Sequence, residues 1–325
     1  MRLRNMGKLG LATTFLITTF TSLPAFTAED NTGLYIEEII VTARKKSESI
    51  QDVPLAVTAI TDQLREGSVR RLEDIQALAP NLFITRTPGI ASGAALTIRG
   101  VASLESDKSF EPSIGVVMDG MFLGTSRGVL LDNFDIGRIE VLRGPQGTLF
   151  GKNTTGGILN IIRTPVSMNE RSVDLKLTAG EYGRQDVSAV VQLPIIQDTL
   201  GLKLFAAKVE HDGHVRNTTR NEDVGGDDKT NYGFTALWAP TDNFDLKVHY
   251  EIMEDKSVQG AYVNRNQVGE LACTLTQIGF DPANGCEKDA NDGKDKTESD
   301  GKNFSDNDYK STIITANYDT DAFLY

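Results

Sequence analysis

The C-terminal half of the sequence alternates apolar and polar residues with a period of two. The apolar rows lie at residues 173–179, 187–193, 200–206, 232–238 and 244–252, and a sixth strand is predicted near residues 309–318. Successive side chains of a strand point to opposite faces, so each row predicts a strand with one apolar face. Such rows, about ten residues long, are typical of strands that cross a bilayer at a tilt. Tyr232 and Trp238, near the two ends of one row, fit aromatic girdles.

The lengths of the connections alternate as well. Short turns are predicted at residues 194–199, 240–243 and 319–321 on one side of the sheet, and long loops at 211–230 and 254–308 on the other, where only 181–184 is short. Short periplasmic turns and longer extracellular loops are the rule for outer-membrane barrels. A soluble antiparallel sandwich also alternates along its strands, but it does not predict this order of loop lengths.

The N-terminal half, from residue 51 to 165, has a mixed α/β pattern. Strands are predicted at 53–60, 96–99, 114–118, 139–142 and 158–162, a short helix after residue 61 and an amphipathic helix at 68–79. The Asp119-Gly120 pair predicts a hairpin turn.

The glycine-rich stretch that follows the fourth strand does not match a phosphate loop. Only three residues separate Gly147 from Gly151, and Asn153 stands where that loop needs a hydroxyl residue. These glycines are better explained by positive φ angles and close backbone approach.

The first residues have the order of a secretory signal. Arg2, Arg4 and Lys8 precede an apolar run at 9–20, and small residues follow to Ala25 or Ala28. This order predicts a signal peptide over residues 1–28, and its apolar run is too short to span a bilayer as a helix.

A short β-prone segment at 36–43 follows the predicted signal. Its last six residues are Glu38, Ile39, Ile40, Val41, Thr42 and Ala43, of which four are β-branched. A lone exposed strand has unpaired backbone groups and adds as an edge strand to a partner. The alternative is the first buried strand of the domain that follows.

Charge and composition exclude several classes of function. The formal net charge is −12, whereas nucleic-acid binding needs a basic surface. Catalytic signatures such as a nucleophile elbow or a zinc-ligand cluster are not found, so we predict no enzyme.

No metal or cofactor is predicted either. His211 and His214 are too few ligands for a metal site, and Gly293 comes one position early, relative to Asp289, for a calcium loop. Cys273 and Cys286 lie in one polar segment, and after export a disulfide between them is the default expectation.

Taken together, the motifs resemble the N-terminal part of a TonB-dependent outer-membrane receptor. The segment Glu38–Ala43 resembles the TonB box of that family. Motifs similar to those of its plug domain follow in order: Asp52-Val53-Pro54-Leu55-Ala56-Val57, Leu72-Glu73-Asp74-Ile75, Ile98-Arg99-Gly100, Val117-Met118-Asp119-Gly120, Ile139-Glu140-Val141-Leu142-Arg143-Gly144-Pro145 and Gly156-Gly157-Ile158-Leu159-Asn160-Ile161-Ile162. Each motif alone is weak, but their order and spacing together are specific.

The resemblance implies a fold and its place in the cell. We expect a TonB box at 36–43, an α+β plug domain at 50–165 and, at 171–325, the first six to seven strands of an incomplete antiparallel transmembrane β-barrel. The implied location is the outer membrane of a Gram-negative bacterium, with the plug and the box facing the periplasm. Closing a barrel of the family's size needs about fifteen more strands. We therefore expect a fragment or a truncated product that does not transport by itself, or alternatively an isolated periplasmic plug module.

The resemblance also implies an activity. Receptors of this family import scarce nutrients, most often ferric siderophores and otherwise cobalamin, haem or oligosaccharides. The implied partners are TonB, with its inner-membrane energising complex, and an extracellular ligand, while no cofactor is implied. Arg99 and Arg143 are expected to dock the plug on acidic residues of the barrel wall, a task that suits the bidentate guanidinium group.

Overall fold

A computed structural model of the chain describes residues 39–66, 69, 71–87, 93–102, 111–124, 134–258, 296–297 and 306–320. The predicted signal peptide, Glu38 and the cysteines at 273 and 286 lie outside these residues. From Ile39 onward the chain forms one compact unit. In the described ranges, no helix has the length and apolar character needed to cross a membrane.

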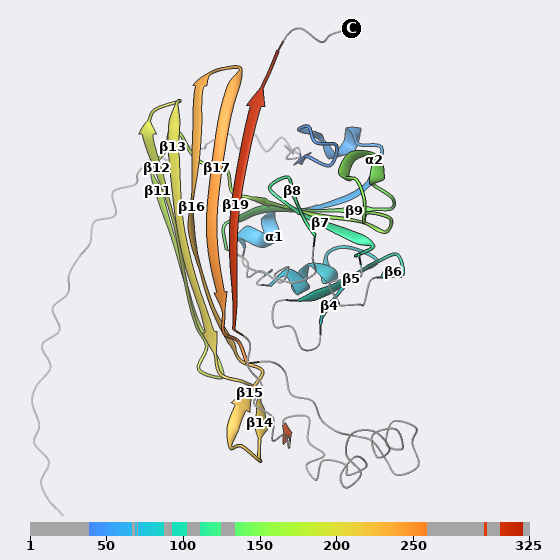
Figure 1. Ribbon diagram of the computed structural model, residues 1–325, viewed down its shortest axis with the longest axis vertical. Coiled ribbons are helices and arrows are strands. Elements are labelled where there is room, and N and C mark those ends of the chain that lie inside the picture. Colours follow the sequence, from blue (N-terminus) through green and yellow to red (C-terminus); the bar gives the residue numbers. More distant parts are fainter. Residues whose placement is uncertain are drawn as a thin grey trace, which may run out of the picture. The chain divides into compact units, whose positions relative to one another are not determined.

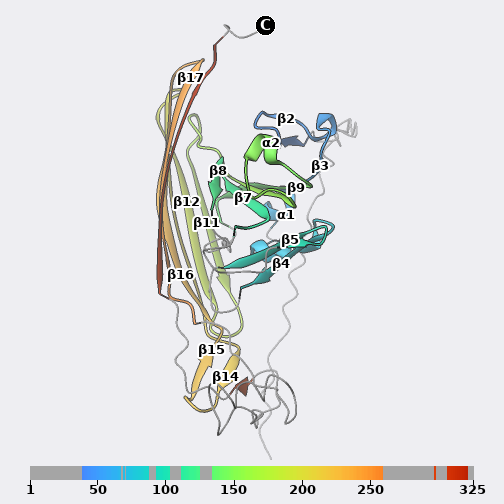
Figure 2. The same ribbon diagram turned by 45° about the vertical axis from the view of Figure 1, so that its right-hand side comes forward.

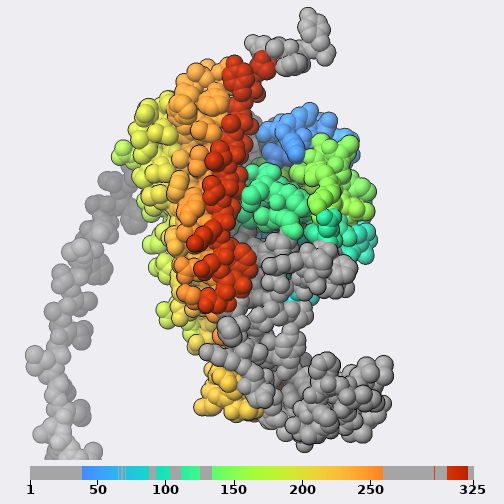
Figure 3. All heavy atoms as spheres, in the orientation of Figure 1, coloured from blue at the N-terminus to red at the C-terminus, as the bar shows by residue number. Residues whose placement is uncertain are grey.

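The C-terminal half forms one antiparallel sheet, which we call the strand wall. Its six strands follow the order β11-β12-β13-β16-β17-β19 and run side by side in Figures 1 and 2. In Figure 3, β19 (red) runs alongside β17 (orange). The bounds are β11 (Ser172–Ala179), β12 (Gln185–Ile196), β13 (Leu200–His211), β16 (Asp227–Thr241), β17 (Phe244–Asp255) and β19 (Asn307–Tyr318). The prediction of a sixth strand near residues 309–318 is confirmed.

The two faces of the strand wall differ in chemistry. One face is apolar and exposed, and Leu175 and Ile314 on it keep 64% and 67% of their surface accessible. The other face buries polar and charged residues, among them Lys203, His249 and Glu251. Alternation along each strand separates the two faces, as the sequence pattern predicts.

Connections between the wall strands alternate in length. Short turns join β12 to β13 and β16 to β17, whereas 15 residues separate β13 from β16. That longer connection contains a hairpin of β14 (Val215–Asn217) and β15 (Glu222–Val224), and β18 (Lys296–Thr297) pairs in parallel with β14. The predicted order of short and long connections is therefore confirmed as far as β19, and the turn predicted at 319–321 runs into residues outside the described ranges.

The N-terminal half, which we call the plug, contains two larger sheets. The five-stranded sheet has the order β3-β9-β10-β7-β8 and the three-stranded sheet the order β4-β5-β6. The strands are β3 (Ala56–Ile60), β4 (Leu82–Arg86), β5 (Ala94–Ile98), β6 (Val101–Ala102), β7 (Ile114–Met118), β8 (Met121–Leu123), β9 (Ile136–Arg143) and β10 (Gly157–Arg163). A further hairpin joins β1 (Ile40–Val41) to β2 (Glu48–Ser49).

The helices of the plug are all short. They are η1 (Ile50–Asp52), α1 (Asp62–Arg65), η2 (Leu72–Ala77) and α2 (Gly147–Phe150). The amphipathic helix predicted over residues 68–79 is wrong in type and length, because η2 is a six-residue 3-10 helix. It still buries Leu72 and Ile75, two of the apolar residues that suggested a helix. Strand β4 follows it directly and was not predicted.

The five-stranded sheet of the plug is covered on both faces. One face packs on the larger core with η2, β4 and β5, to which Ile139, Val141 and Leu159 contribute. The other face, with Val117, Leu142 and Ile158, packs on a smaller core formed with Val41, Ala43 and Val53. Residues before β3, namely Val41, Ala43 and Val53, therefore cover this second face of the sheet.

Two glycines of the plug are required by the backbone. The Asp119-Gly120 turn between β7 and β8 has φ angles of 47° and 86°, which confirms the hairpin turn of the sequence pattern. Gly157 has a φ of 145°, and a Cβ there would lie 2.3 Å from the carbonyl oxygen of Leu142. Any side chain at residue 157 would therefore collide with strand β9.

Candidate functional site

The segment that resembles a TonB box is docked on the plug. Ile40 and Val41 form β1, which pairs antiparallel with β2 of the same hairpin. Ile39 and Ile40 are exposed, whereas Val41 and Ala43 have no accessible surface. The prediction of a lone exposed strand is wrong for this part of the segment, because Val41 and Ala43 complete the smaller core of the plug.

A buried carboxylate lies directly beneath this segment. Glu140, in the middle of β9, has no accessible surface, and its Oε1 accepts a hydrogen bond from the backbone N–H of Thr42 at 2.7 Å. The Thr42 hydroxyl lies 3.2 Å from the same oxygen. Arg138 Nε donates to Oε1 at 2.7 Å, and Asn160 Nδ2 donates to Oε2 at 3.1 Å.

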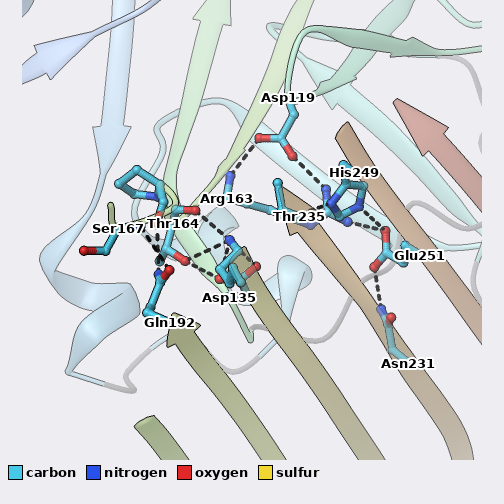
Figure 4. A network of polar contacts seen from close by, with 12 residues as sticks. Asp119, Asp135, Arg163, Thr164, Ser167, Gln192, Asn231, Thr235, His249 and Glu251 are labelled. Atoms are coloured by element: carbon cyan, nitrogen blue, oxygen red, sulfur yellow. Dashed lines mark hydrogen bonds and ion pairs between the residues drawn. The ribbon is translucent and has the colours of Figure 1, made fainter. Parts of the chain in front are cut away.

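A second group of polar contacts connects the plug to the strand wall. Arg163, at the end of β10, donates to Asp119 Oδ2 at 3.0 Å and forms an ion pair with Glu251 of β17 (Figure 4). Burial of Arg163 acts to lower its pKa, but Glu251 and Asp119 outweigh this effect and raise it. Both Arg163 and Asp119 keep less than a tenth of their side-chain surface exposed, so the ion pair between Arg163 and Asp119 is shielded from water.

On the wall, Glu251 belongs to a network of its own. Asn231 Nδ2 donates to Glu251 at 2.7 Å, and His249 Nε2 lies 3.4 Å from it (Figure 4). The other ring nitrogen of His249 lies 2.8 Å from the hydroxyl of Thr235, and its ring stacks on Phe205. The Glu251 carboxylate that pairs with Arg163 is therefore positioned by residues of β13, β16 and β17.

The second plug–wall contact is a fully buried ion pair. Lys203 Nζ of β13 lies 2.7 Å from Asp135 Oδ2, and both side chains keep only 1% of their surface. Lys203 also donates to the carbonyl oxygen of Thr164 at 2.6 Å. The hydroxyl of Thr164 donates to Asp135 in turn.

A third contact lies where β13 and β16 meet η2 and β4. Asp227 of β16 is buried and accepts from Arg71 Nη2 at 3.1 Å. His211 Nε2 lies 3.0 Å from the same carboxylate, and Arg86 Nη1 lies 3.8 Å from its other oxygen. One carboxylate of the wall therefore holds two arginines of the plug.

The two arginines chosen from sequence occupy a different position. Arg143 Nε donates to the carbonyl oxygen of Pro80 at 3.0 Å, and its Nη2 donates to Thr58, so these contacts lie inside the plug. Burial and the nearby positive charge of Arg99 lower the pKa of Arg143. The two guanidinium groups thus lie close together, while the described wall strands contact Arg71, Arg86 and Arg163 instead. Docking of Arg99 and Arg143 on the wall stays a prediction.

The sequence reasoning assigned no role to the charged residues that organise these contacts, among them Glu140, Arg163 and Lys203. The signal for Glu140 is a carboxylate inside the apolar run of β9, where an unpaired charge is costly. Within the ranges that the structure describes, no group of three or more His, Cys, Asp or Glu side chains is placed to hold a metal ion.

Comparisons with known proteins agree with this architecture. Residues 49–158 match the family model of the TonB-dependent Receptor Plug Domain. The pesticin receptor of Yersinia pestis is 25% identical over 268 residues, which are 80% of this chain and 38% of the relative. The vitamin B12 transporter BtuB of Vibrio vulnificus is 25% identical over 185 residues, which are 55% of this chain and 28% of that protein.

Among solved structures, the ferric yersiniabactin uptake receptor FyuA from Yersinia pestis has the same fold. It superposes with a TM-score of 0.67 at 20% identity, over 82% of this chain and 39% of FyuA. The chain thus spans about two fifths of the length of the pesticin receptor and of FyuA. Residues 49–158 are thus similar to the plug domain of TonB-dependent receptors, and the chain shares the fold of FyuA.

Proposed function

We propose that the chain belongs to a receptor that imports a ferric siderophore across the outer membrane with energy supplied through TonB. The observation that carries this proposal is the combination of a plug that has apolar cores of its own with a strand wall that buries charged and polar residues toward the plug and exposes an apolar face on the other side. An apolar outer face suits lipid, and a polar inner face suits a plug that water can reach. The description of FyuA as a ferric yersiniabactin uptake receptor supports an iron ligand.

In this proposal the segment Glu38–Ala43 is the strand that TonB captures. An extended peptide with a free edge binds by strand addition, in which its backbone N–H and C=O groups pair with the partner. Ile39 and Ile40 are the exposed part of this segment. TonB therefore meets these two residues first, and the plug faces the periplasm.

A proline at Ile40 tests this role. Proline removes a ladder donor, so Ile40→Pro is expected to reduce uptake of radiolabelled ferric siderophore to the level of cells that lack TonB. Ligand binding to whole cells at low temperature is expected to stay unchanged. The control Ile40→Ala keeps the N–H group and is expected to keep uptake. Normal uptake by the proline variant would overturn the assignment of the segment.

The ligand class needs a separate experiment, because the match to a vitamin B12 transporter favours cobalamin as a second candidate. A strain that lacks the gene is grown with single iron sources or with cobalamin as the limiting nutrient. A growth defect confined to one class of ferric siderophore supports the proposal. A defect confined to cobalamin supports the second candidate instead.

A further inference from the structure

Residues 39–43, which we call the box segment, cover one face of the plug sheet. Glu140 lies on that face. Its neighbours Ile139 and Val141 point to the larger core, whereas Leu142 belongs to the smaller core together with Val41 and Ala43. When the segment leaves, this face of the sheet becomes accessible. On that face the carboxylate of Glu140 accepts from the backbone of the segment, and the guanidinium of Arg138 lies 3.4 Å from the hydroxyl of Thr42.

The contact between Glu140 and Thr42 uses the backbone N–H of Thr42, a group that a partner strand would need. β1 pairs with β2 through Ile40 and Val41, and the backbone N–H of Thr42 donates to Glu140 Oε1 instead of to β2. Strand addition uses the outward N–H groups along a free edge. Glu140 therefore already accepts a hydrogen bond from a backbone N–H group on the edge to which a partner strand would add.

The carboxylate keeps partners after the segment is released. Arg138 and Asn160 both belong to the plug sheet and donate to Glu140, and each also lies 3.4–3.5 Å from the hydroxyl of Thr42. Arg138 keeps 20% of its side-chain surface, so its charge already reaches solvent. An unpaired buried charge would oppose release strongly, and these two donors avoid that cost. The arrangement suits a contact that opens and closes repeatedly.

We propose that Glu140 is a latch that retains the box segment on the plug and competes for the backbone of Thr42 until TonB captures the strand. This proposal rests on the proposed function only in naming TonB as the competitor. Retention of the segment itself depends on Glu140 and is measured without TonB. Glu140 is thus a positioning residue for the transport cycle.

The test measures how fast a buried thiol next to the latch reacts. Ala43→Cys places a small thiol at a position with no accessible surface, in a background in which Cys273 and Cys286 are replaced by serine. The receptor is labelled with a polar maleimide in outer-membrane vesicles from cells without TonB. Glu140→Gln keeps the shape of the side chain and removes its charge. It is expected to raise the labelling rate ~10- to 100-fold, which is the factor that the loss of a charge-assisted hydrogen bond gives.

Two matched variants separate the latch from a general loosening of the plug. Glu73→Gln removes a carboxylate that pairs with Arg86 and not with the box segment, and its labelling rate at residue 43 is expected to be unchanged. Ala79→Cys reports on the larger core, on the opposite face of the sheet, and is expected to stay protected in Glu140→Gln. An unchanged rate at residue 43 overturns the proposal. An equal rise at residues 43 and 79 also overturns it, because Glu140 would then stabilise the whole plug.

A second measurement distinguishes failure of the latch from failure of the proposed function. The purified C-terminal domain of TonB is titrated onto the same vesicles without ligand. If residue 43 becomes reactive and TonB binding rises in Glu140→Gln, both proposals are supported. If residue 43 becomes reactive and TonB binding does not change, the latch stands and the box segment is not the strand that TonB takes.

Discussion

The plug sheet buries Ile139, Val141 and Leu159 on its larger core, whereas the strand wall buries Lys203, His249 and Glu251 on its inner face. An apolar core is held by removing surface from water and does not require a particular partner. The inner face of the wall buries apolar residues as well as matched charges, among them Lys203 with Asp135. The difference teaches that the plug has apolar cores of its own, whereas its junction with the wall relies on paired charges beside an aromatic contact between Phe134 and Phe205.

The largest effect is expected from breaking one of those contacts on a single side. Lys203→Leu leaves Asp135 buried without its cation and is expected to lower the free energy of unfolding by about 3–5 kcal/mol. The measurement is urea denaturation of the purified receptor. The double variant with Asp135→Leu removes both charges and is expected to recover most of the loss.

The same strand offers a control for this variant. Lys208 pairs with Asp228 on the other face of β13 and is 40% exposed, so Lys208→Leu is expected to change the free energy of unfolding by at most about 1 kcal/mol. If Lys203→Leu behaves like Lys208→Leu, the buried pair does not hold plug and wall together.

A smaller effect is expected on the outer face, next to Lys203 in sequence. On the proposed function Leu204 faces lipid, and Leu204→Arg is expected to cost about 2–4 kcal/mol if the residue lies near the middle of the bilayer. The measurement is a urea titration of the receptor folded into lipid vesicles. Leu204→Val is the control and is expected to cost less than about 1.5 kcal/mol. Equal tolerance of both substitutions would mean that this face does not meet hydrocarbon.

The smallest effect is expected from trimming the core of the plug. Ile139→Val removes one buried methylene and is expected to lower the free energy of unfolding by about 0.5–1.5 kcal/mol, measured by urea denaturation. Ile314→Val makes the same chemical change on the exposed face of β19, where the side chain keeps 67% of its surface. In detergent it is expected to have no measurable effect. A larger loss at Ile314 than at Ile139 would contradict the contrast between the two regions.

Local pattern was sufficient to predict the strand wall. Each strand separates an apolar face from a polar face, so the row from Phe244 to Ile252 shows the period of two directly, and β17 covers it. The Asp119-Gly120 turn was equally predictable, because the required φ angles restrict the residue types. Both features depend on neighbours in sequence.

Contacts between distant residues explain what was missed. Thr42 and Glu140 are 98 positions apart, and nothing near Thr42 in sequence indicates that the box segment is docked. Lys203 stands between Leu202 and Leu204 like any polar residue of an alternating row, and its burial depends on Asp135 of the plug. The choice of Arg99 and Arg143 followed a family motif, while the described contacts with the wall use Arg71, Arg86 and Arg163.

The turn residue Asp119 has two tasks. Its φ of 47° forms the tip of the β7–β8 hairpin, and its carboxylate accepts from both the backbone N–H and the guanidinium of Arg163. Asparagine would keep the left-handed backbone but lose the charge, and glutamate would keep the charge but favour the backbone less. Residue 119 therefore has few acceptable substitutions, and a designer who transplants this plug into another barrel has to keep the aspartate or redesign the hairpin and its anchor together.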